Sequence, residues 1–470
     1  MGLVDEPAMI PKVPGMALSH LLAFRNKRLA FQMRLMNEFG DVCRMWIGPF
    51  PAIIISSAEL AQSVLVEKAA HFVKSRGLQV TRPLLGNGLL TSEYEFHRRQ
   101  RKLISPGLQH RRVGTYAGVM ASFAEAAQAR WMDGEAIDVS AAMMKLTLAI
   151  AGKTMFDADL EGEASEIGQA LTIANRALSE QITSILPAPL SWPLPRNWPV
   201  KRAIRRLERT VYQMIADRRA SGRDPGDILS MLLAAEEEGS GSKMTDVEVR
   251  DETMTLFLAG HETTANALAW TLYLLSRHAD IYSRLRAEVD GALSGRTPAF
   301  EDAPRLPYTL RVFKESMRLY PPAYIIGRQA TSDVDIGRYR VPKKMTVFIN
   351  TYGIHRRAKY FDEPERFDPD RFLPEKEAQM RSTYIPFGGG PRVCIGNQFA
   401  LLEGQLVLAA LMQRVVFEAA DDRVVEPEPL ITLRPRHGIR LVVRKRPSPV
   451  GASTERFDRK QLQGASGEAT

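Results

Sequence analysis

The chain has 470 residues, of which 45% are hydrophobic and 25% charged, as in soluble globular proteins and unlike disordered or repetitive chains. Its formal net charge of +9 is scattered over segments of helical character, and no zinc-finger or RNA-binding signature accompanies it, so we expect no nucleic-acid partner. Two cysteines, Cys43 and Cys394, cannot build a disulfide framework and favour a reducing compartment, which predicts a cytoplasmic protein.

The N-terminal third begins with acids and prolines and contains no run of about 18 apolar residues, so we expect neither a signal peptide nor a membrane anchor. Apolar spacing predicts a helix over 18–38. Two strands are predicted around a turn at 49–51, and Cys43 is interpreted as a small buried hydrophobe in the first of them. A further helix is predicted over 57–73.

Residues 97 to 290 have a mostly helical pattern, interrupted at 186–200 by prolines that exclude a helix interior. This stretch is either a packed loop or a flexible loop that faces the substrate. Thr245 and Glu248 then form a capping-box pattern, and no proline follows up to Ala279. We therefore expect a helix about 50 Å long that crosses the core.

The last part of the chain, after residue 320, contains prolines and short β-like runs. Residues 447–470 are polar, and we expect them to be disordered. No linker of different composition divides the rest. The sequence therefore predicts one mainly helical domain with small β-sheets, an α+β fold, over residues 1–446.

The segment FGGGPRVCIGNQFA, residues 387–400, places Cys394 between a glycine-rich loop and a predicted helix. The glycines allow close approach of the backbone, and a helix N-terminus stabilises a thiolate. A buried inert thiol, a nucleophile and a metal ligand are the alternatives for a lone cysteine. No second Cys or His stands at zinc spacing, and a single thiolate beside a glycine surface suits an axial ligand to a planar macrocycle.

This loop resembles the cysteine-ligand loop of the cytochrome P450 haem-thiolate monooxygenases, in a soluble bacterial-type form. AGHETT at 259–264, ESMR at 315–318, FDPDRF at 367–372 and HRRQR at 97–101 appear in the order found in that family. The resemblance covers roughly residues 10–446. It implies a triangular prism with a long central helix, haem b with the Cys394 thiolate as metal ligand, and O2 as cosubstrate.

The resemblance also implies roles for individual residues. Thr263 holds dioxygen at the haem and Glu262 feeds a proton relay. From the residues alone, the Thr263 hydroxyl can bond the carbonyl of Ala259 and open a polar notch in the helix. The implied cofactor-binding residues are His97, Arg101, Arg328, Phe387, Arg392, Cys394 and Gly396, with the bases on the haem propionates.

Glu315, Arg318 and Arg371 resemble the structural triad of the family. Without the resemblance, Glu315 and Arg318 would be read as a surface ion pair, and the helix carrying His97 as a solvated basic helix. The implied substrate pocket includes Ala259, Ala323, Ile325, Ile326 and Ile431. These apolar residues favour a small hydrophobic substrate such as a lipid, terpenoid or macrolide-like compound.

The resemblance implies an enzyme that inserts one oxygen atom from O2 into its substrate, by hydroxylation or epoxidation. Electrons are expected from a separate ferredoxin or flavodoxin-type donor with its reductase, docked near Arg98, Arg99 and Lys102, and the protein is expected to be a monomer. A peroxide-using hydroxylase or isomerase is an alternative, although such enzymes tend to lose the acid–threonine pair. A haem-based gas sensor is a third, but no output domain is recognised.

Overall fold

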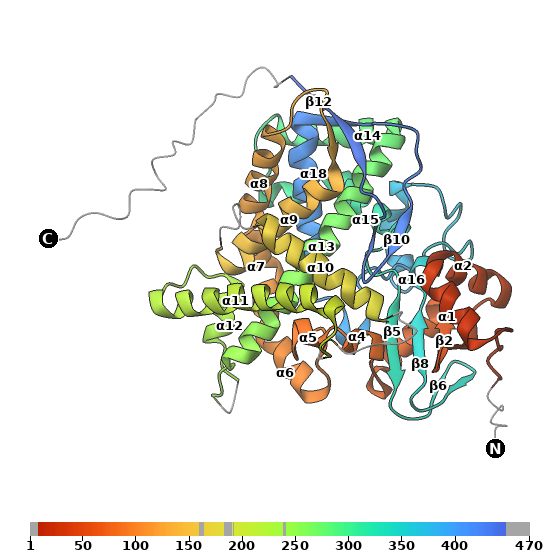
Figure 1. Cartoon of the computed structure of the whole chain (residues 1–470). Coiled ribbons are helices and arrows are strands. Elements are labelled where there is room, and N and C mark those ends of the chain that lie inside the picture. Colours follow the sequence, from red (N-terminus) through yellow and green to blue (C-terminus); the bar gives the residue numbers. More distant parts are fainter. Residues whose placement is uncertain (1–7, 159–163, 183–189, 191, 238–240, 448–470) are drawn as a thin grey trace.

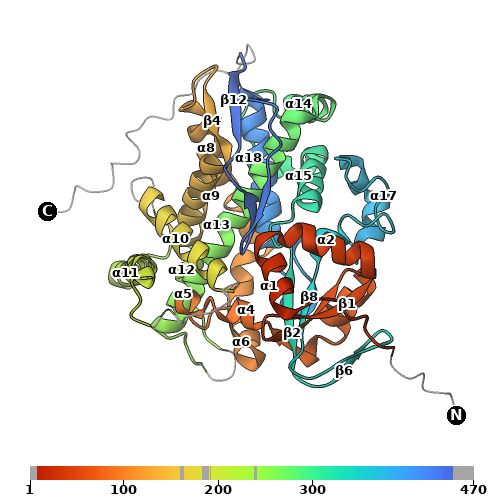
Figure 2. The same cartoon turned by 45° about the vertical axis from the view of Figure 1, so that its right-hand side comes forward.

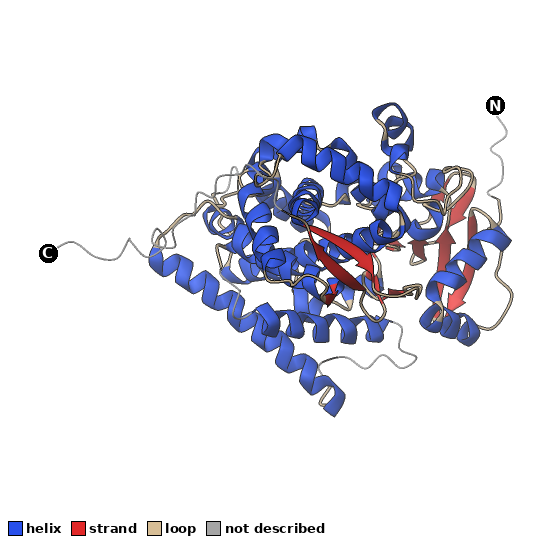
Figure 3. Cartoon of the chain, turned by 90° about the horizontal axis from the view of Figure 1, so that it is seen from above, coloured by secondary structure: helices blue, strands red, loops and turns tan. Residues whose placement is uncertain are grey.

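The computed structural model describes residues 8–158, 164–182, 190, 192–237 and 241–447. The expected disordered tail from 448 onward and much of the interrupted stretch at 186–200 lie outside these residues. Helices fill one side of the molecule, and the largest sheet lies at the other (Figures 1 and 3).

The α-helices are α1 (Ala17–Asn26), α2 (Arg28–Phe39), α3 (Ala58–Gln62), α4 (Arg76–Gln79), α5 (Arg82–Leu85), α6 (Tyr94–Ile104), α7 (His110–Gly114), α8 (Ala117–Ala129), α9 (Val139–Phe156), α10 (Ala164–Ile182), α11 (Trp198–Ser221), α12 (Ile228–Ala234), α13 (Asp246–Arg277), α14 (Ala279–Leu293), α15 (Pro307–Leu319), α16 (Thr351–Ile354), α17 (Pro374–Glu377) and α18 (Asn397–Arg414). The strands are β1 (Val42–Ile47), β2 (Phe50–Ile55), β3 (Phe72–Lys74), β4 (Ala136–Asp138), β5 (Ile326–Ala330), β6 (Val334–Ile336), β7 (Tyr339–Val341), β8 (Thr346–Ile349), β9 (Val415–Ala419), β10 (Pro427–Pro429), β11 (Leu433–Pro435) and β12 (Arg440–Lys445).

The long helix predicted through the core is α13, with 32 residues. It begins with the predicted capping box, in which Thr245 and Glu248 each bond the other's backbone N–H. Most of its side chains are buried on all sides, because helices pack around it. Trp270 is fully buried and stacks on Tyr320, with ring centroids 3.9 Å apart. The helix therefore forms the centre of the main hydrophobic core.

The main sheet has the strand order β1-β2-β8-β5-β3. Helices α1 and α2 lie beside its β1 end (Figure 2). Separate hydrophobic clusters cover its two faces, one reaching α1 and α2 and the other α3 and β6–β7. At the opposite edge β3 pairs antiparallel with β5, and this register sets Lys74 against Arg328. The sheet therefore brings two basic residues together that are far apart in the sequence.

Two predicted helices differ from the structure. The helix expected over 18–38 is broken at Lys27, and the break turns Arg28 inward, where it donates to the carbonyl of Pro429. The helix expected over 57–73 ends as a π-helical and a 3-10 turn before β3. There the antiparallel pairing with β5 overrides the local helical pattern.

Among the described residues, one helix is long and apolar enough to cross a membrane, α9 over Val139–Phe156. However, 67% of that window is buried inside the protein, largely against α13. A helix in this position is a core helix.

Candidate active site

The cysteine loop forms a tight turn that depends on its glycines. Gly388 and Gly390 have φ angles of 73° and 66°, which other residues rarely adopt. A Cβ atom on Gly390 would also collide with the carbonyl group of Leu65. The backbone N–H of Cys394 donates to the carbonyl of Phe387 over 2.9 Å, and α18 begins three residues after the cysteine. The local geometry expected around Cys394 is therefore present.

The Cys394 side chain retains exposed surface even though protein atoms surround it. We infer that this surface opens into an enclosed space rather than onto the outside of the molecule. Burial raises the pKa of the thiol above its ordinary value, and the Gly396 N–H and the Arg101 charge only partly oppose this. The Gly396 N–H thus acts in the direction expected of the helix N-terminus, while the loss of solvation acts against it. A bound cation would be needed to hold the thiolate.

A short segment of α13 is open although the helix on both sides of it is buried. Ala259 is exposed, and Gly260 and Thr263 are half-buried. The Thr263 hydroxyl donates to the carbonyl of Ala259 over 2.6 Å, as predicted. This bond leaves the lone pairs of Thr263 Oγ1 available to a ligand beside the open segment.

The acid next to this threonine is directed elsewhere. Glu262 is buried, and its Oε1 accepts the hydroxyl of Thr432 over 2.5 Å. Successive residues on a helix do not face each other, so Glu262 does not point along the same side as Thr263. The sequence had no signal for Thr432, because it lies 170 residues away in the turn between β10 and β11.

The open segment lies close to the cysteine helix. Thr264, the next residue of α13, lies beside Glu403 of α18. Burial raises the pKa of Glu403 well above its ordinary value, and Thr264 partly opposes this. The chain thus brings the two motifs, 130 residues apart, to one part of the interior.

A cluster of basic side chains, which we call the basic cluster, lies beside the cysteine loop. Burial, together with the neighbouring positive charges, lowers the pKa of His97 to about 3. Burial also lowers the pKa of Arg328 to about 10. The cluster consists of Lys74, His97, Arg101, Arg328 and Arg392.

Lys74 is the member that sequence reasoning missed. It is 5% exposed, and its Nζ donates to the carbonyls of Leu89 over 2.8 Å and Ser92 over 2.5 Å. Burial lowers its pKa to about 7. The sequence pattern around Lys74 is only a weak indication of this role, because the pairing of β3 with β5 is what places this lysine opposite Arg328.

Two arginines of the basic cluster also hold the cysteine loop in place. Arg101 donates to the carbonyl of Val393 over 2.8 Å. Arg392 donates to Glu93 over 2.7 Å and to the carbonyl of Phe72 over 3.0 Å. Its buried Nε has no hydrogen-bond partner among the described residues.

These features fit a haem. Buried like charges set against each other cost free energy unless an anion lies between them, and the two haem propionates are such anions. The orphaned Nε of Arg392 is a further donor available to them. Cys394 would supply a sulfur ligand, and the open segment of α13 offers the small residues Ala259 and Gly260, which would allow close approach of a flat ring.

The structure brings the expected triad together. Arg318 donates to both carboxylate oxygens of Glu315, over 2.7 and 2.8 Å, and both side chains are fully buried. Arg371 Nε donates to Glu315 over 3.3 Å. The surface-pair alternative is therefore wrong. Asp370, which precedes Arg371 in the chain, pairs with Arg284 and Arg311.

The residues expected to line a substrate pocket come from three segments, and a backbone hydrogen bond joins two of these segments. The Leu433 N–H donates to the carbonyl of Pro322, which sets the turn that carries Ile431 against Ala323. Ile326 lies beside Gly388 of the cysteine loop, whereas Ile325 packs with the hydrophobic cluster of α1 and α2. Ile325 thus faces away from Ile326.

One of the basic residues expected to dock the electron donor is already paired within the protein. Arg99 donates to Glu248 over 2.8 Å and to Glu237 over 3.3 Å. It secures the start of α13 and is not a free surface charge. Arg98 is exposed and paired with Glu95.

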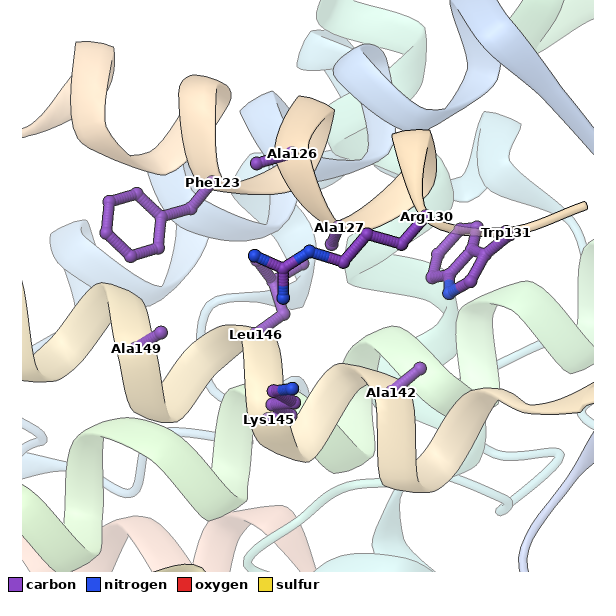
Figure 4. A pocket seen from close by; sticks show the side chains of 9 residues that line it. All are labelled: Phe123, Ala126, Ala127, Arg130, Trp131, Ala142, Lys145, Leu146 and Ala149. Atoms are coloured by element: carbon purple, nitrogen blue, oxygen red, sulfur yellow. The ribbon is translucent and has the colours of Figure 1, made fainter. Parts of the chain in front are cut away.

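A cavity of about 120 Å³ lies between α8 and α9 (Figure 4). Its walls are mostly apolar, and the charged residues Arg130 and Lys145 also line it. It is lined by Phe123, Ala126, Ala127, Arg130, Trp131, Ala142, Lys145, Leu146 and Ala149. None of these residues belongs to the cysteine loop, the open segment of α13 or the basic cluster, so this cavity is separate from the candidate active site.

An enclosed cysteine before a helix, an open threonine segment and a buried basic cluster define a haem-thiolate protein. Comparison with known proteins agrees. The family model for cytochrome P450 matches residues 9–442. The chain belongs to the cytochrome P450 family, and it is a haem-dependent monooxygenase that acts on a hydrophobic substrate with electrons from a redox partner.

Individual relatives are similar over nearly their whole length. Cyclooctatin synthase of Streptomyces melanosporofaciens is 38% identical over 88% of this chain and 91% of the relative. Cyclooctat-9-en-7-ol 5-monooxygenase of the same organism is 34% identical, over 87% and 90%. The crystal structure of the cytochrome P450DA heme domain has a TM-score of 0.86 at 27% identity and covers 95% of this chain and 99% of that one.

Proposed function

We propose that the chain hydroxylates or epoxidises a terpenoid at a haem held by Cys394. The observation that carries this proposal is the exposed surface of Cys394 just before α18, a helix whose Glu403 lies beside Thr264 at the end of the open Ala259–Thr263 segment. The similarity to an enzyme named as a monooxygenase of cyclooctat-9-en-7-ol supports an unsaturated apolar substrate. The apolar side chains proposed for the pocket are Ala323, Ile326 and Ile431. None of them is charged, so an apolar substrate could bind beside them without removing water from a charged group.

The haem, when bound, supplies the redox chemistry by which dioxygen is activated. The chain's own residues would hold and orient it: Cys394 Sγ would bind the iron, and the basic cluster would neutralise the propionates. We assign to Phe387 and Gly396 the packing of the loop on either side of the cysteine.

The proton-handling residues are proposed to be Thr263 and Glu262. Thr263 Oγ1, fixed by the carbonyl of Ala259, orients a hydrogen bond into the open segment. The Glu262 carboxyl group accepts the Thr432 hydroxyl, so delivery of a proton to the open segment requires that carboxyl group to rotate away from Thr432. Thr432 is therefore assigned a part in setting how readily the Glu262 carboxyl group turns toward the open segment.

The axial ligand is tested by the spectrum of the reduced carbon monoxide complex. We expect the long-wavelength absorption typical of thiolate ligation in the wild type and its loss in Cys394→Ala. Cys43→Ala is the matched control, because Cys43 is buried within β1 and should not change the spectrum. An imidazole-like spectrum in the wild type would refute the proposal.

We further propose that residues 1–446 form a single domain of a monomeric cytoplasmic enzyme, served by a ferredoxin or flavodoxin-type donor with its reductase. Turnover of a terpenoid panel, first screened by the spin-state shift on binding, is measured with each donor pair and with peroxide alone. Product only with a donor pair supports this proposal. Product with peroxide alone would favour the peroxide-using alternative, and no product with either would favour a sensor.

A further inference from the structure

A buried carboxyl group without an assigned role lies on the same helix as the open segment. Glu252 of α13 is 1% exposed. Its Oε2 accepts the backbone N–H of Leu89 over 2.8 Å, while its Oε1 has no hydrogen-bond partner among the described residues. An ionised carboxylate in that position would leave a charged oxygen unsolvated, which favours the protonated form.

The loop over residues 86–92 connects this carboxyl group to the basic cluster. Leu89 donates its N–H to Glu252 and accepts the ammonium of Lys74 at its carbonyl, over 2.8 Å in each case. Two residues earlier, the N–H of Asn87 donates to Asp251 over 2.7 Å. A Cβ atom on Gly88 would collide with Thr255 of α13, so the loop packs directly on the helix. One residue, Leu89, thus connects a buried acid to a buried base.

The charges around this pair set its proton affinity. Burial raises the pKa of Glu252 to about 8, with Asp251 and Glu248 raising it and Lys74 lowering it. Burial, together with the charges of Arg392 and Arg328, lowers the pKa of Lys74 to about 7. Glu93 and Glu252 act in the opposite direction. Both groups therefore exchange protons near neutral pH, where isolated side chains of these types do not.

We propose that Glu252, joined to Lys74 through Leu89, is a positioning residue that couples reduction of the haem to uptake of a proton. The inference rests on haem binding at Cys394 as proposed above. In the coupled step the iron gains one electron from an external reductant, and the Glu252–Lys74 pair gains a proton from solvent. No other bond is formed or broken.

The direction of the effect follows from charge. An added electron makes the haem more negative, and a negative charge raises the pKa of both an acid and a base near it. The reduced protein therefore binds more protons than the oxidised protein around the pKa values of the pair. Its midpoint potential must then fall as pH rises through that range and be flat on either side.

The experiment is a redox titration of the purified haem-loaded protein at intervals from pH 6 to pH 10. We expect a falling midpoint potential in the wild type and at least a twofold smaller slope in Glu252→Gln, which retains an oxygen to accept the Leu89 N–H. Lys74→Met should reduce the slope as well, and the double variant should lose no more than the larger single effect. Asp290→Asn, which alters a surface carboxyl paired with Arg446, should keep the wild-type slope.

A second readout does not use the iron. The infrared carbonyl band of a protonated carboxyl group should be present in the wild type at pH 6.5 and reduced in Glu252→Gln. A flat wild-type potential, or equal slopes in wild type and Glu252→Gln, overturns the inference even if a variant folds poorly. Loss of the thiolate-type carbon monoxide spectrum in the wild type would instead be the failure of the proposed function.

Discussion

The buried triad of Glu315, Arg318 and Arg371 predicts a large and selective loss of stability. Glu315→Ala removes the one carboxyl group that, among the described residues, meets the fully buried guanidinium of Arg318. Arg318 keeps its bonds to the carbonyls of His355, Pro364 and Arg366, but its charge is then uncompensated. Breaking such a pair by removing one partner costs about 3–5 kcal/mol. The folded-to-unfolded ratio should therefore fall by roughly a hundredfold or more, at about 1.4 kcal/mol per tenfold.

Urea unfolding of the haem-loaded protein, followed by circular dichroism, measures this loss as a lower midpoint at unchanged slope. The matched control is Glu38→Ala, which breaks a pair with Arg34 at 3.9 Å in which both side chains are more than half exposed. That variant should lose at most about 0.5 kcal/mol. Equal losses in the two variants, or a loss below about 1 kcal/mol in Glu315→Ala, would refute the reasoning about the buried charge.

Three further predictions concern the active site and its surroundings. Gly390→Ala should prevent haem loading, because the new Cβ collides with Leu65, whereas Gly118→Ala, which meets no atom within 4 Å, should load normally; absorbance of the purified proteins decides. Thr263→Ala should consume reductant without matching product, and Thr263→Ser should restore part of the coupling; equal product yields would remove the hydroxyl from the proposed role. The raised pKa of Glu252 means that the folded protein binds more protons than the unfolded chain between about pH 4.5 and 8, so stability falls with rising pH in that window. Glu252→Gln should flatten this part of the urea-midpoint profile, and an unchanged profile would show that the carboxyl group ionises normally.

Local signals made the central helix and the cysteine loop predictable. The capping box at Thr245 and the glycines at 388 and 390 determine backbone conformation within a few residues, and both appear as expected. The hydroxyl bond from Thr263 to Ala259 is also local, since it spans a single helical turn. Each of these features depends on neighbours in sequence.

The missed features depend on neighbours in space. No local pattern in the sequence singles out Lys74 or Glu252, and only the pairing of β3 with β5 and the packing of the 86–92 loop on α13 buries them. The predicted helix over 57–73 failed for the same reason, because Phe72 and Lys74 bond to a strand more than 250 residues away. Propensity within one segment does not contain such pairings.

The turn between β10 and β11 constrains how this enzyme can diversify. It carries Ile431 toward the proposed pocket and, one residue later, bonds Glu262 through Thr432. A substitution that reshapes the turn for a larger or smaller substrate also shifts Thr432, the partner of the proposed proton donor Glu262. Substitutions in this turn that admit a new substrate would therefore also increase the amount of reductant consumed without product. Substitutions at Ala323 or Ile326 would alter the proposed pocket without that effect.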